Sequence, residues 1–503
     1  MRRPAPLALT ALTADRRTGP DGFIRFDVGE RDWICLAMGC AAGLQDLLAL
    51  WCEGNQVRMA LGVPGEGLRA IVSHPVKKGQ FPSVGLNHAP ALRLERTIRD
   101  LKGPEAVDHP DARGWIDHGI WPGRKIDQKR PRATVAYSFL PVEGVGLHQI
   151  PVGPVHAGII EPGHFRFTAQ GEAVVRLEER LGYVHRGVED LIRGRSIAEA
   201  AALAARVSGD STVAWSLAFS RAVEQTLGWQ VPTRAVLLRA IMAEMERIAN
   251  HIGDFGAVCN DASVIVIQAQ CMILRESILQ QAAQCFGHRL MMDCVIPGGV
   301  AADLSSEGAG ALSALLSRIT SDFDRIVAVY DEAPSLQDRT VTTGIVQPAL
   351  AARFAAGGHV GRASGRACDT RIIYPYAPYD ALVLTPALRQ EGDVNARLWV
   401  RVDEVHSSID LIRQLLHHLE PGPLTAPMPE ARAGEACAMV ESFRGDVLVA
   451  VTLDEKAHVA EAHFRDPSVF QWPLLEAAIE GNIVADFPLC NKSFNCSYAG
   501  HDL

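Results

Sequence analysis

The strongest constraint on the fold is a repeat of apolar residues every three or four positions between residues 238 and 252. This spacing predicts an amphipathic helix that packs one face into a core. Glu244, Arg247 and His251 form a polar stripe beside that face. Similar patterns over residues 189–227, 262–294, 303–332 and 400–419 predict a bundle of about four or five long helices. The apolar positions of the first helix are Leu238, Ile241, Met242, Met245, Ile248, Ala249 and Ile252.

The two ends of the chain have different patterns. A strand-like run at residues 56–61 and a helical one at 92–101 predict a small α+β domain. Residues 446–452 are typical of a strand and residues 473–479 of a short helix. The longest weakly charged stretch, residues 34–52, contains Gln45 and Asp46, which make membrane crossing costly. We therefore expect a buried amphipathic helix there.

The expected fold class is α+β, with a small α/β N-terminal domain followed by a mainly helical bundle domain with peripheral β-strands. We expect a flexible N-terminal arm (1–22), an α+β domain (23–120), a basic linker and connecting strand (121–149), and a large domain (150–503). The C-terminal tail of the large domain should be buried in the bundle. The basic linker could contact an acidic partner, although a solvated connector is the favoured interpretation.

Composition and charge exclude several classes of protein. The 503 residues are 48% apolar and carry a net charge of −9, which is typical of a globular protein and argues against a nucleic-acid partner. The 11 cysteines are odd in number and scattered, and they contain no CxxC pair, which indicates a reducing compartment. The nearest pairs, Cys35/Cys40 and Cys490/Cys496, do not have a usual zinc or iron–sulfur spacing. No segment predicts a membrane span.

Three segments concentrate glycine, histidine and arginine: residues 153–167, 183–189 and 361–371. Glycine lets the backbone approach another surface closely, and guanidinium groups suit buried ion pairs. On the residues alone, these segments favour a structural or interfacial network over a catalytic one.

Taken in order, these segments resemble the large subunit of membrane-bound nickel–iron hydrogenases of the formate hydrogenlyase and hydrogenase-4 type. That family is homologous to the quinone-site subunit of respiratory complex I. The matching motifs are EPGHFR at 161, YVHRG at 183, QVPTRA at 230, LRE at 274, GGV at 298, GRASG at 361 and EGDV at 391. In the first domain, FPSV at 81, ERTIRDL at 95 and HPDAR at 109 resemble the small peripheral-arm subunit of complex I, which the hydrogenase-4 type carries fused at its N-terminus.

The family's metal-binding motifs are altered in this sequence. The motif RxCGxC aligns with residues 206–211, where Ser208 and Ser211 take both cysteine positions. The motif DPCxxC places its two ligands on Ser497 and Gly500. Serine hydroxyls stay protonated near neutral pH and replace thiolates poorly. The resemblance therefore implies that the nickel–iron site is absent and that this chain binds no metal itself.

The resemblance to complex I also implies a possible quinone site. In a gapless alignment, Pro162 and Gly209 take the positions of the histidine and the tyrosine that the complex I subunit uses. His164 and Asp210 are candidate replacements, because quinone reduction needs a proton donor near each carbonyl. The simpler interpretation, that His164 hydrogen-bonds the backbone at a turn, is favoured. The candidate cavity residues are His164, Arg166, Ser208, Asp210, Ser211, Ser497 and Tyr498, and the candidate structural or interface residues are His185, Arg186, Glu189, Arg275, Arg362, Asp369 and Arg371.

The resemblance further implies partner subunits. These are an iron–sulfur small subunit with its cluster at the cavity, a ferredoxin-like subunit and antiporter-like membrane subunits. Through them the chain would lie peripherally on the inner, cytoplasmic face of the cell membrane. Three hypotheses for function stay open: a cavity that handles a quinone or another acceptor, a catalytically silent scaffold, or a hydrogenase with atypical metal ligation.

Overall fold

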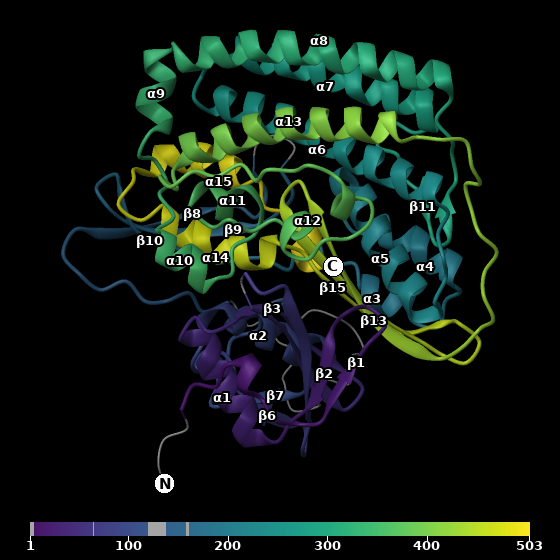
Figure 1. Ribbon diagram of the computed structural model, residues 1–503. Helices are drawn as coiled ribbons and strands as arrows, with labels where there is room; N and C mark the ends of the chain where they lie inside the picture. The colour runs from purple at the N-terminus through teal and green to yellow at the C-terminus, as the bar shows by residue number, and fades with distance from the viewer. Residues whose placement is uncertain (1–4, 64, 119–136, 157–159) are drawn as a thin grey trace.

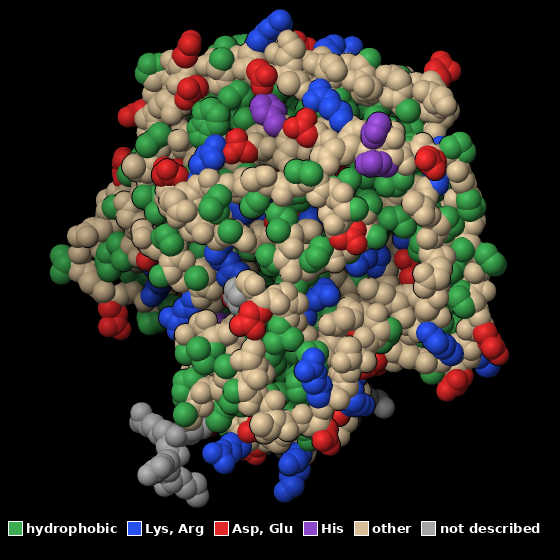
Figure 2. Space-filling view, in the orientation of Figure 1, with side chains coloured by type: hydrophobic (Ala, Val, Ile, Leu, Met, Phe, Trp, Pro, Cys, Tyr) green, Lys and Arg blue, Asp and Glu red, His purple; other side chains and the backbone are tan. Residues whose placement is uncertain are grey.

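The computed structural model describes residues 5–63, 65–118, 137–156 and 160–503. The N-terminal part lies below a bundle of long helices, and the C-terminus lies between the two (Figure 1). The described residues combine long helices with several small sheets, which confirms the predicted α+β class. Acidic and basic side chains are interspersed over the face shown in Figure 2.

A five-stranded sheet with the order β1-β2-β5-β4-β3 organises the N-terminal part. Helices α1 and α2 pack against this sheet and bury Trp33 completely. The predicted helix at residues 92–101 is α2, and it ends at Gly103, whose φ of +99° suits glycine. The elements are β1 (Arg16–Thr18), β2 (Ile24–Asp27), α1 (Glu30–Ala41), β3 (Asp46–Glu53), β4 (Gln56–Val63), β5 (Leu68–Pro75), β6 (Gln80–Pro82), α2 (Leu92–Lys102) and β7 (Glu105–Val107).

Two antiparallel three-stranded sheets belong to the larger part. One consists of β8 (Leu147–Val152), β9 (His164–Gln170) and β10 (Ala173–Arg180). The other consists of β13 (Gly434–Ser442), β14 (Gly445–Leu453) and β15 (Val459–Arg465), and the predicted strand at residues 446–452 is β14. A small hairpin is formed by β11 (Val295–Ile296) and β12 (Gly299–Val300).

The long helices form the core of the larger part. Helix α6 packs against both α7 and α13, and α8 covers α7 (Figure 1). The predicted apolar face of α6 is confirmed, because each of its seven positions is 3% exposed or less. The long helices are α5 (Thr212–Leu227), α6 (Thr233–Asp261), α7 (Ile265–Phe286), α8 (Ser306–Asp331) and α13 (Val394–His417). The shorter ones are α3 (Val188–Ile192), α4 (Ile197–Ala204), α9 (Pro334–Thr340), α10 (Pro348–Arg353), α11 (Gly358–Ala363), α12 (Thr370–Ile373), α14 (Ser468–Ala478), α15 (Phe487–Phe494) and α16 (Tyr498–Asp502).

Two expectations for the N-terminal part are wrong. Residues 5–22 of the expected flexible arm instead pack on the domain, since Leu9 is buried and β1 pairs with β2. The single helix expected at residues 34–52 is the end of α1 followed by β3, with Gly43 at a φ of +74° in the turn between them. A continuous apolar run fits a buried helix or a buried strand equally well, so periodicity could not separate them. Residues 121–136 of the expected linker lie outside the described residues.

The helical expectation for residues 189–227 is too simple. Three helices share this stretch, and the second begins at a capping box in which Ser196 and Glu199 exchange hydrogen bonds. Such a box satisfies backbone N–H groups at a helix start, which makes a new helix begin there. Helix α7 also stops before residue 294, because Gly287 adopts a φ of +79°.

The polar stripe of α6 is completely buried, and charges from distant segments compensate it. Glu244, Arg247 and His251 are 1% exposed or less. Arg371 donates to Glu244 at 3.0 Å, and the Nε2–H of His251 donates to Glu404 at 2.7 Å. This tautomer follows from the other ring nitrogen, Nδ1, which accepts from the Arg401 guanidinium at 2.9 Å.

Arg362 is the centre of this network. Its guanidinium donates to Glu404 at 2.7 Å and to Glu441 at 2.8 Å, and Arg362 is 0% exposed. Burial alone would raise the pKa of Glu404, but Arg362 and the hydrogen bond from His251 hold that pKa well below its usual range. Burial lowers the pKa of His251 to about 4. At neutral pH the network therefore contains an ionised Glu404 and a neutral His251.

We expect Glu404→Ala to destabilise the protein by about 3–5 kcal/mol, because it leaves the buried Arg362 guanidinium short of one carboxylate. Chemical unfolding of the purified protein measures this change. The control is Asp293→Ala, which removes a half-exposed pair with Arg206 and should leave the unfolding midpoint unchanged. Equal midpoints for the two variants would contradict the importance of the network.

Candidate functional site

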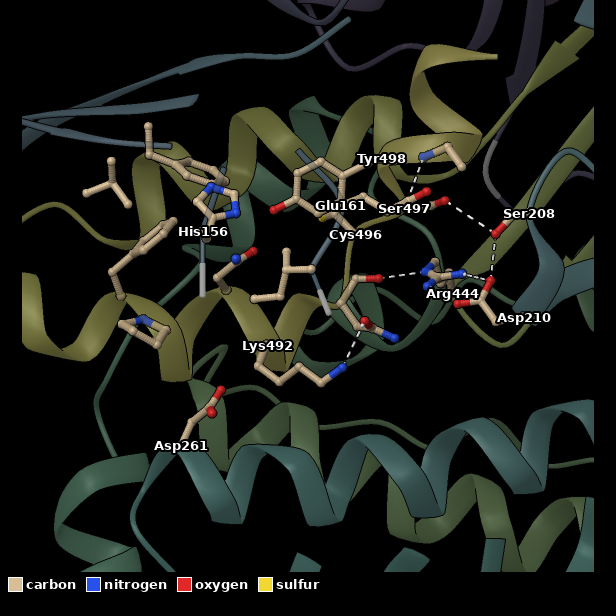
Figure 3. A pocket seen from close by; sticks show the side chains of 18 of the residues that line it. His156, Glu161, Ser208, Asp210, Asp261, Arg444, Lys492, Cys496, Ser497 and Tyr498 are labelled. Atoms are coloured by element: carbon tan, nitrogen blue, oxygen red, sulfur yellow. Dashed lines mark hydrogen bonds and ion pairs between the residues drawn. The ribbon is translucent and has the colours of Figure 1, made fainter. Parts of the chain in front are cut away.

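A cavity of about 630 Å³ lies where the C-terminal segment meets β8, β9 and the end of α6. Four groups of residues line it: Val152, His156, Ile160, Glu161 and Phe165 on one side, residues 208–210 and Arg444 on another, Asp261 at the end of α6, and residues from 487 to 499 of the C-terminal segment. Apolar and polar side chains are mixed along these walls (Figure 3). A concave site of this size with few convergent polar groups is typical of a small-molecule pocket.

Two of the serines at the family's cysteine positions meet at this cavity. Ser208 and Ser497 are 289 positions apart in the sequence, and their hydroxyl oxygens lie 3.4 Å apart. The backbone N–H of Gly500 donates to the Ser497 hydroxyl at 2.8 Å. Ser211 follows one turn after Ser208 and is buried, and its hydroxyl has no hydrogen-bond partner among the described residues.

An ion pair occupies the space beside these serines. Arg444 donates to both oxygens of Asp210, at 2.9 and 2.6 Å, and the Ser208 hydroxyl donates to Asp210 at 2.6 Å (Figure 3). Burial would raise the pKa of Asp210, but the charge of Arg444 and the hydrogen bonds from Arg444 and Ser208 together hold that pKa well below its usual range. The Arg444 Nε–H donates to the carbonyl of Asn495 at 2.6 Å. The pair is therefore internally satisfied.

No room for a side chain exists at Gly500. A Cβ atom there would lie 2.2 Å from a carboxylate oxygen of Asp466 and 2.9 Å from the Ser497 hydroxyl. The carboxylate is held in place by a hydrogen bond from the Ser468 N–H at 2.8 Å. The fourth thiolate position of the family is thus closed to a cysteine in this backbone arrangement.

The opposite wall contains two polar residues that the sequence analysis did not select. His156 donates through Nε2 to the Gly163 carbonyl at 2.7 Å, and the other ring nitrogen, Nδ1, is buried without a partner among the described residues. Glu161 accepts from the Ala499 N–H at 3.1 Å, which ties this wall to the C-terminal segment. Gly153 permits the close packing, because it has a φ of +84° and a Cβ there would lie 2.6 Å from the His156 ring.

The lower part of the cavity carries a lysine and a carboxylate (Figure 3). Lys492 lies 3.5 Å from Asp254 and 3.3 Å from the Asn495 side-chain oxygen. Burial raises the pKa of Asp261, and the charge of Lys492 opposes this shift. Asp261, Arg444 and Lys492 were missed because no local motif surrounds them. His156 and Glu161, in contrast, lie within the histidine- and glycine-rich segment at residues 153–167, which was an available signal.

Of the seven candidate cavity residues, Ser208, Asp210, Ser497 and Tyr498 line the cavity, whereas His164, Arg166 and Ser211 do not. Successive side chains on a strand point to opposite faces, and Phe165 takes the cavity face of β9. His164 and Arg166 therefore lie on the other face, where His164 contacts the Gly153 carbonyl at 3.0 Å. This contact matches the simpler interpretation of His164 as a residue that hydrogen-bonds the backbone.

The residues expected to be structural make contacts between distant segments. His185 lies 2.7 Å from the carbonyl of Asp502, and Arg186 donates to the carbonyls of Arg206 and Val207. Glu189 lies 2.8 Å from His463 on β15. Arg275 packs over Gly253 between α6 and α7, while Arg362, Asp369 and Arg371 belong to the buried network.

Comparison with known proteins places this architecture in a family. The model "Respiratory-chain NADH dehydrogenase, 49 Kd subunit" matches residues 261–433 and 427–502, and the model "Nickel-dependent hydrogenase" matches residues 186–260. Formate hydrogenlyase subunit 5 of Escherichia coli (strain K12) is 31% identical over 443 residues, which cover 84% of this chain and 77% of that protein. The carbon monoxide-induced hydrogenase of Rhodospirillum rubrum is 33% identical over 350 residues, covering 69% of this chain and 97% of the relative.

A solved structure extends the comparison. A chain of the membrane-bound sulfane sulfur reductase, an archaeal respiratory membrane complex, superposes with a TM-score of 0.68 at 26% identity, covering 72% of this chain and all of that one. The protein belongs to the family of nickel–iron hydrogenase large subunits and complex I 49 kDa subunits. Its relatives are subunits of membrane-bound hydrogenase and complex I-like assemblies. No helix among the described residues is both long and apolar enough to cross a membrane.

We expect Gly500→Ala to destabilise the protein by about 1–3 kcal/mol, because the added Cβ forces Asp466 away from its partners. Gly209→Ala is the matched control in the same site, since a Cβ at Gly209 meets no atom within 4 Å. Thermal unfolding of both variants provides the measurement. A loss at Gly209 as large as the one at Gly500 would argue against a closed fourth ligand position.

Proposed function

We propose that this chain is a subunit of a membrane-bound electron-transfer complex and that its cavity handles a quinone or another small acceptor without nickel–iron chemistry. The observation that carries the proposal is the open, partly polar cavity that lies directly beside Ser208 and Ser497. Tight filling by side chains at this place would have favoured a catalytically silent scaffold. A space of about 630 Å³ with both apolar and hydrogen-bonding walls supports a substrate site.

The donor set beside the cavity does not fit a nickel–iron group. Three of the four ligand positions carry a serine, namely Ser208, Ser211 and Ser497. The fourth is Gly500, where a side chain would collide with Asp466. Soft thiolates are the ligands that nickel and its bridged iron need in this family, and hard hydroxyl groups replace them poorly. The internally satisfied pair of Asp210 and Arg444 further supports a site without metal.

The similarity to complex I and hydrogenase subunits supports a set of partners for this chain. An iron–sulfur small subunit would deliver electrons at the cavity, and a ferredoxin-like subunit would supply that cluster. Antiporter-like membrane subunits would hold the chain at the inner, cytoplasmic face of the membrane. In this arrangement Lys492, Tyr498 and His156 are the residues that would orient the acceptor by hydrogen bonds.

Elemental analysis and hydrogen–deuterium exchange of the purified intact complex test the absence of nickel chemistry. We expect no stoichiometric nickel and no exchange activity, because the thiolate ligands are replaced. Stoichiometric nickel together with exchange activity would establish the third hypothesis, a hydrogenase with atypical ligation, and would overturn the proposal.

A cavity-filling variant tests the acceptor site. We expect Val152→Trp to reduce the reduction of a short-chain ubiquinone analogue by the intact complex by at least about tenfold, because the indole occupies the space that the acceptor needs. Val152→Ala, which enlarges the same wall, is the matched control and should stay close to the wild-type rate. Equal rates in both variants would remove the cavity from the reaction, and no acceptor reduction by the wild-type complex would favour the scaffold.

A further inference from the structure

A buried and a partly buried carboxyl group share one guanidinium behind the wall of the cavity. Glu179 on β10 and Glu476 on α14 both contact Arg93 of α2, at 3.2 and 2.6 Å respectively. The Glu179 side chain is 0% exposed, and those of Arg93 and Glu476 are 13% and 21% exposed. The cluster therefore joins three elements, including a helix of the N-terminal part, around a single positive charge.

The hydrogen bonds are divided unequally between the two carboxyl groups. One oxygen of Glu476 receives both the Arg93 guanidinium and the backbone N–H of Glu179, the latter at 2.7 Å. Glu179 receives only the longer contact from Arg93, and its Oε1 is buried without a partner among the described residues. A buried carboxylate with an unpaired oxygen is costly, whereas the neutral acid needs far less solvation. Glu179 is thus the poorer site for a negative charge.

The charges that face the pair reinforce this difference. Burial, followed by the charge of Glu476, raises the pKa of Glu179 well above its usual range, and Arg93 only partly opposes the shift. Burial also raises the pKa of Glu476, where Arg93 opposes the shift and Glu178 adds to it. Glu480, two residues beyond the end of α14, adds a further negative charge near Glu476. Two carboxylates this close to one cation do not both ionise readily.

The pair lies one side-chain layer from the cavity. Glu179 is paired with Phe165 in the β9–β10 ladder, so the two side chains lie on the same face of the sheet, and Phe165 lines the cavity. A negative charge on Glu179 acts on two residues that line the cavity, Cys496 and Tyr498. Burial is the main cause that raises the pKa of each, and the charge of Glu179 raises it further. A change of protonation in the pair therefore changes the electrostatic potential at the cavity.

We propose that Glu179 and Glu476 hold one shared proton at neutral pH, with Glu179 as the protonated member, and that this proton keeps the part of the wall behind Phe165 uncharged while an acceptor gains electrons. The cluster of Arg93, Glu476 and protonated Glu179 is neutral, whereas loss of the proton leaves one negative charge behind Phe165. That charge repels the negative charge that arrives on a reduced acceptor. The presence of the proton is independent of the proposed function, and only its use in the cavity rests on it.

Infrared spectroscopy of the intact complex tests the proton directly. The difference spectrum between the wild type and Glu179→Gln at neutral pH should contain the band of one protonated carboxyl group, while the isosteric amide keeps the packing. Glu178→Gln is the matched control, because Glu178 is the next residue on β10 and is paired with Arg113 and the Leu140 N–H on the other face. A difference spectrum without this band overturns the proposal whatever the complex reduces.

A second variant tests whether the proton is shared. Glu476→Gln removes the neighbouring negative charge, so the Glu179 band should titrate at a lower pH than in the wild type. An unchanged titration would show that Glu179 is protonated by burial alone and would overturn the shared site.

The pH profile of ubiquinone-analogue reduction tests the use of the proton. The wild-type rate should fall at alkaline pH as the pair ionises, and Glu179→Gln should keep the neutral-pH rate and lose that fall. An alkaline fall that persists in Glu179→Gln would contradict this use. Because the infrared band does not depend on acceptor reduction, failure of the proposed function leaves the test of the proton intact.

Discussion

The buried ion network between α6 and α13 is the interaction on which the cavity depends. Asp254 of α6 pairs with Arg401 of α13 at 2.8 Å, and the same carboxylate accepts from the Asn495 side chain at 2.8 and 3.0 Å. Through Asn495 the bundle holds the segment that carries Ser497 and Tyr498. Removing charges from water is expensive, so such a network persists only when nearly every donor and acceptor finds its partner. The buried charges of the bundle therefore fix the position of the cavity wall that carries Ser497 and Tyr498.

The cavity and the proposed loss of the metal site both follow from the same arrangement. The fold still brings Ser208 and Ser497 together from opposite ends of the large part, as it must if the family's backbone is kept. The chemistry at that point has changed, because Arg444 and Asp210 neutralise each other and Asp466 closes the space at Gly500. What stays open is the neighbouring space between the β8–β9 wall and α15. In this account the chain keeps a place for an acceptor after losing the place for a metal.

Periodicity predicted the parts of the fold in which one physical pattern dominates. The apolar face of α6 and the strand β14 were both visible in the sequence, since each repeats a single period. The division of residues 34–52 into a helix and a strand was not visible, because an apolar run alone does not distinguish a buried helix from a buried strand. Arg371 as a partner of Glu244 and Glu404 as a partner of His251 could not be found either, since each lies more than 100 positions away. For the site, motif alignment selected Ser208 and Ser497, whereas strand alternation directs Phe165 to the cavity and leaves His164 at the Gly153 carbonyl, as its favoured interpretation had it.

The central claim is that a small acceptor binds in the cavity beside Ser497. A structure of the intact complex with a brominated ubiquinone analogue measures this directly through the anomalous signal of bromine. The account predicts a bromine peak inside the space bordered by Phe165, Lys492 and Ser497. A bromine site elsewhere in the complex, with this cavity free of the analogue, would contradict it.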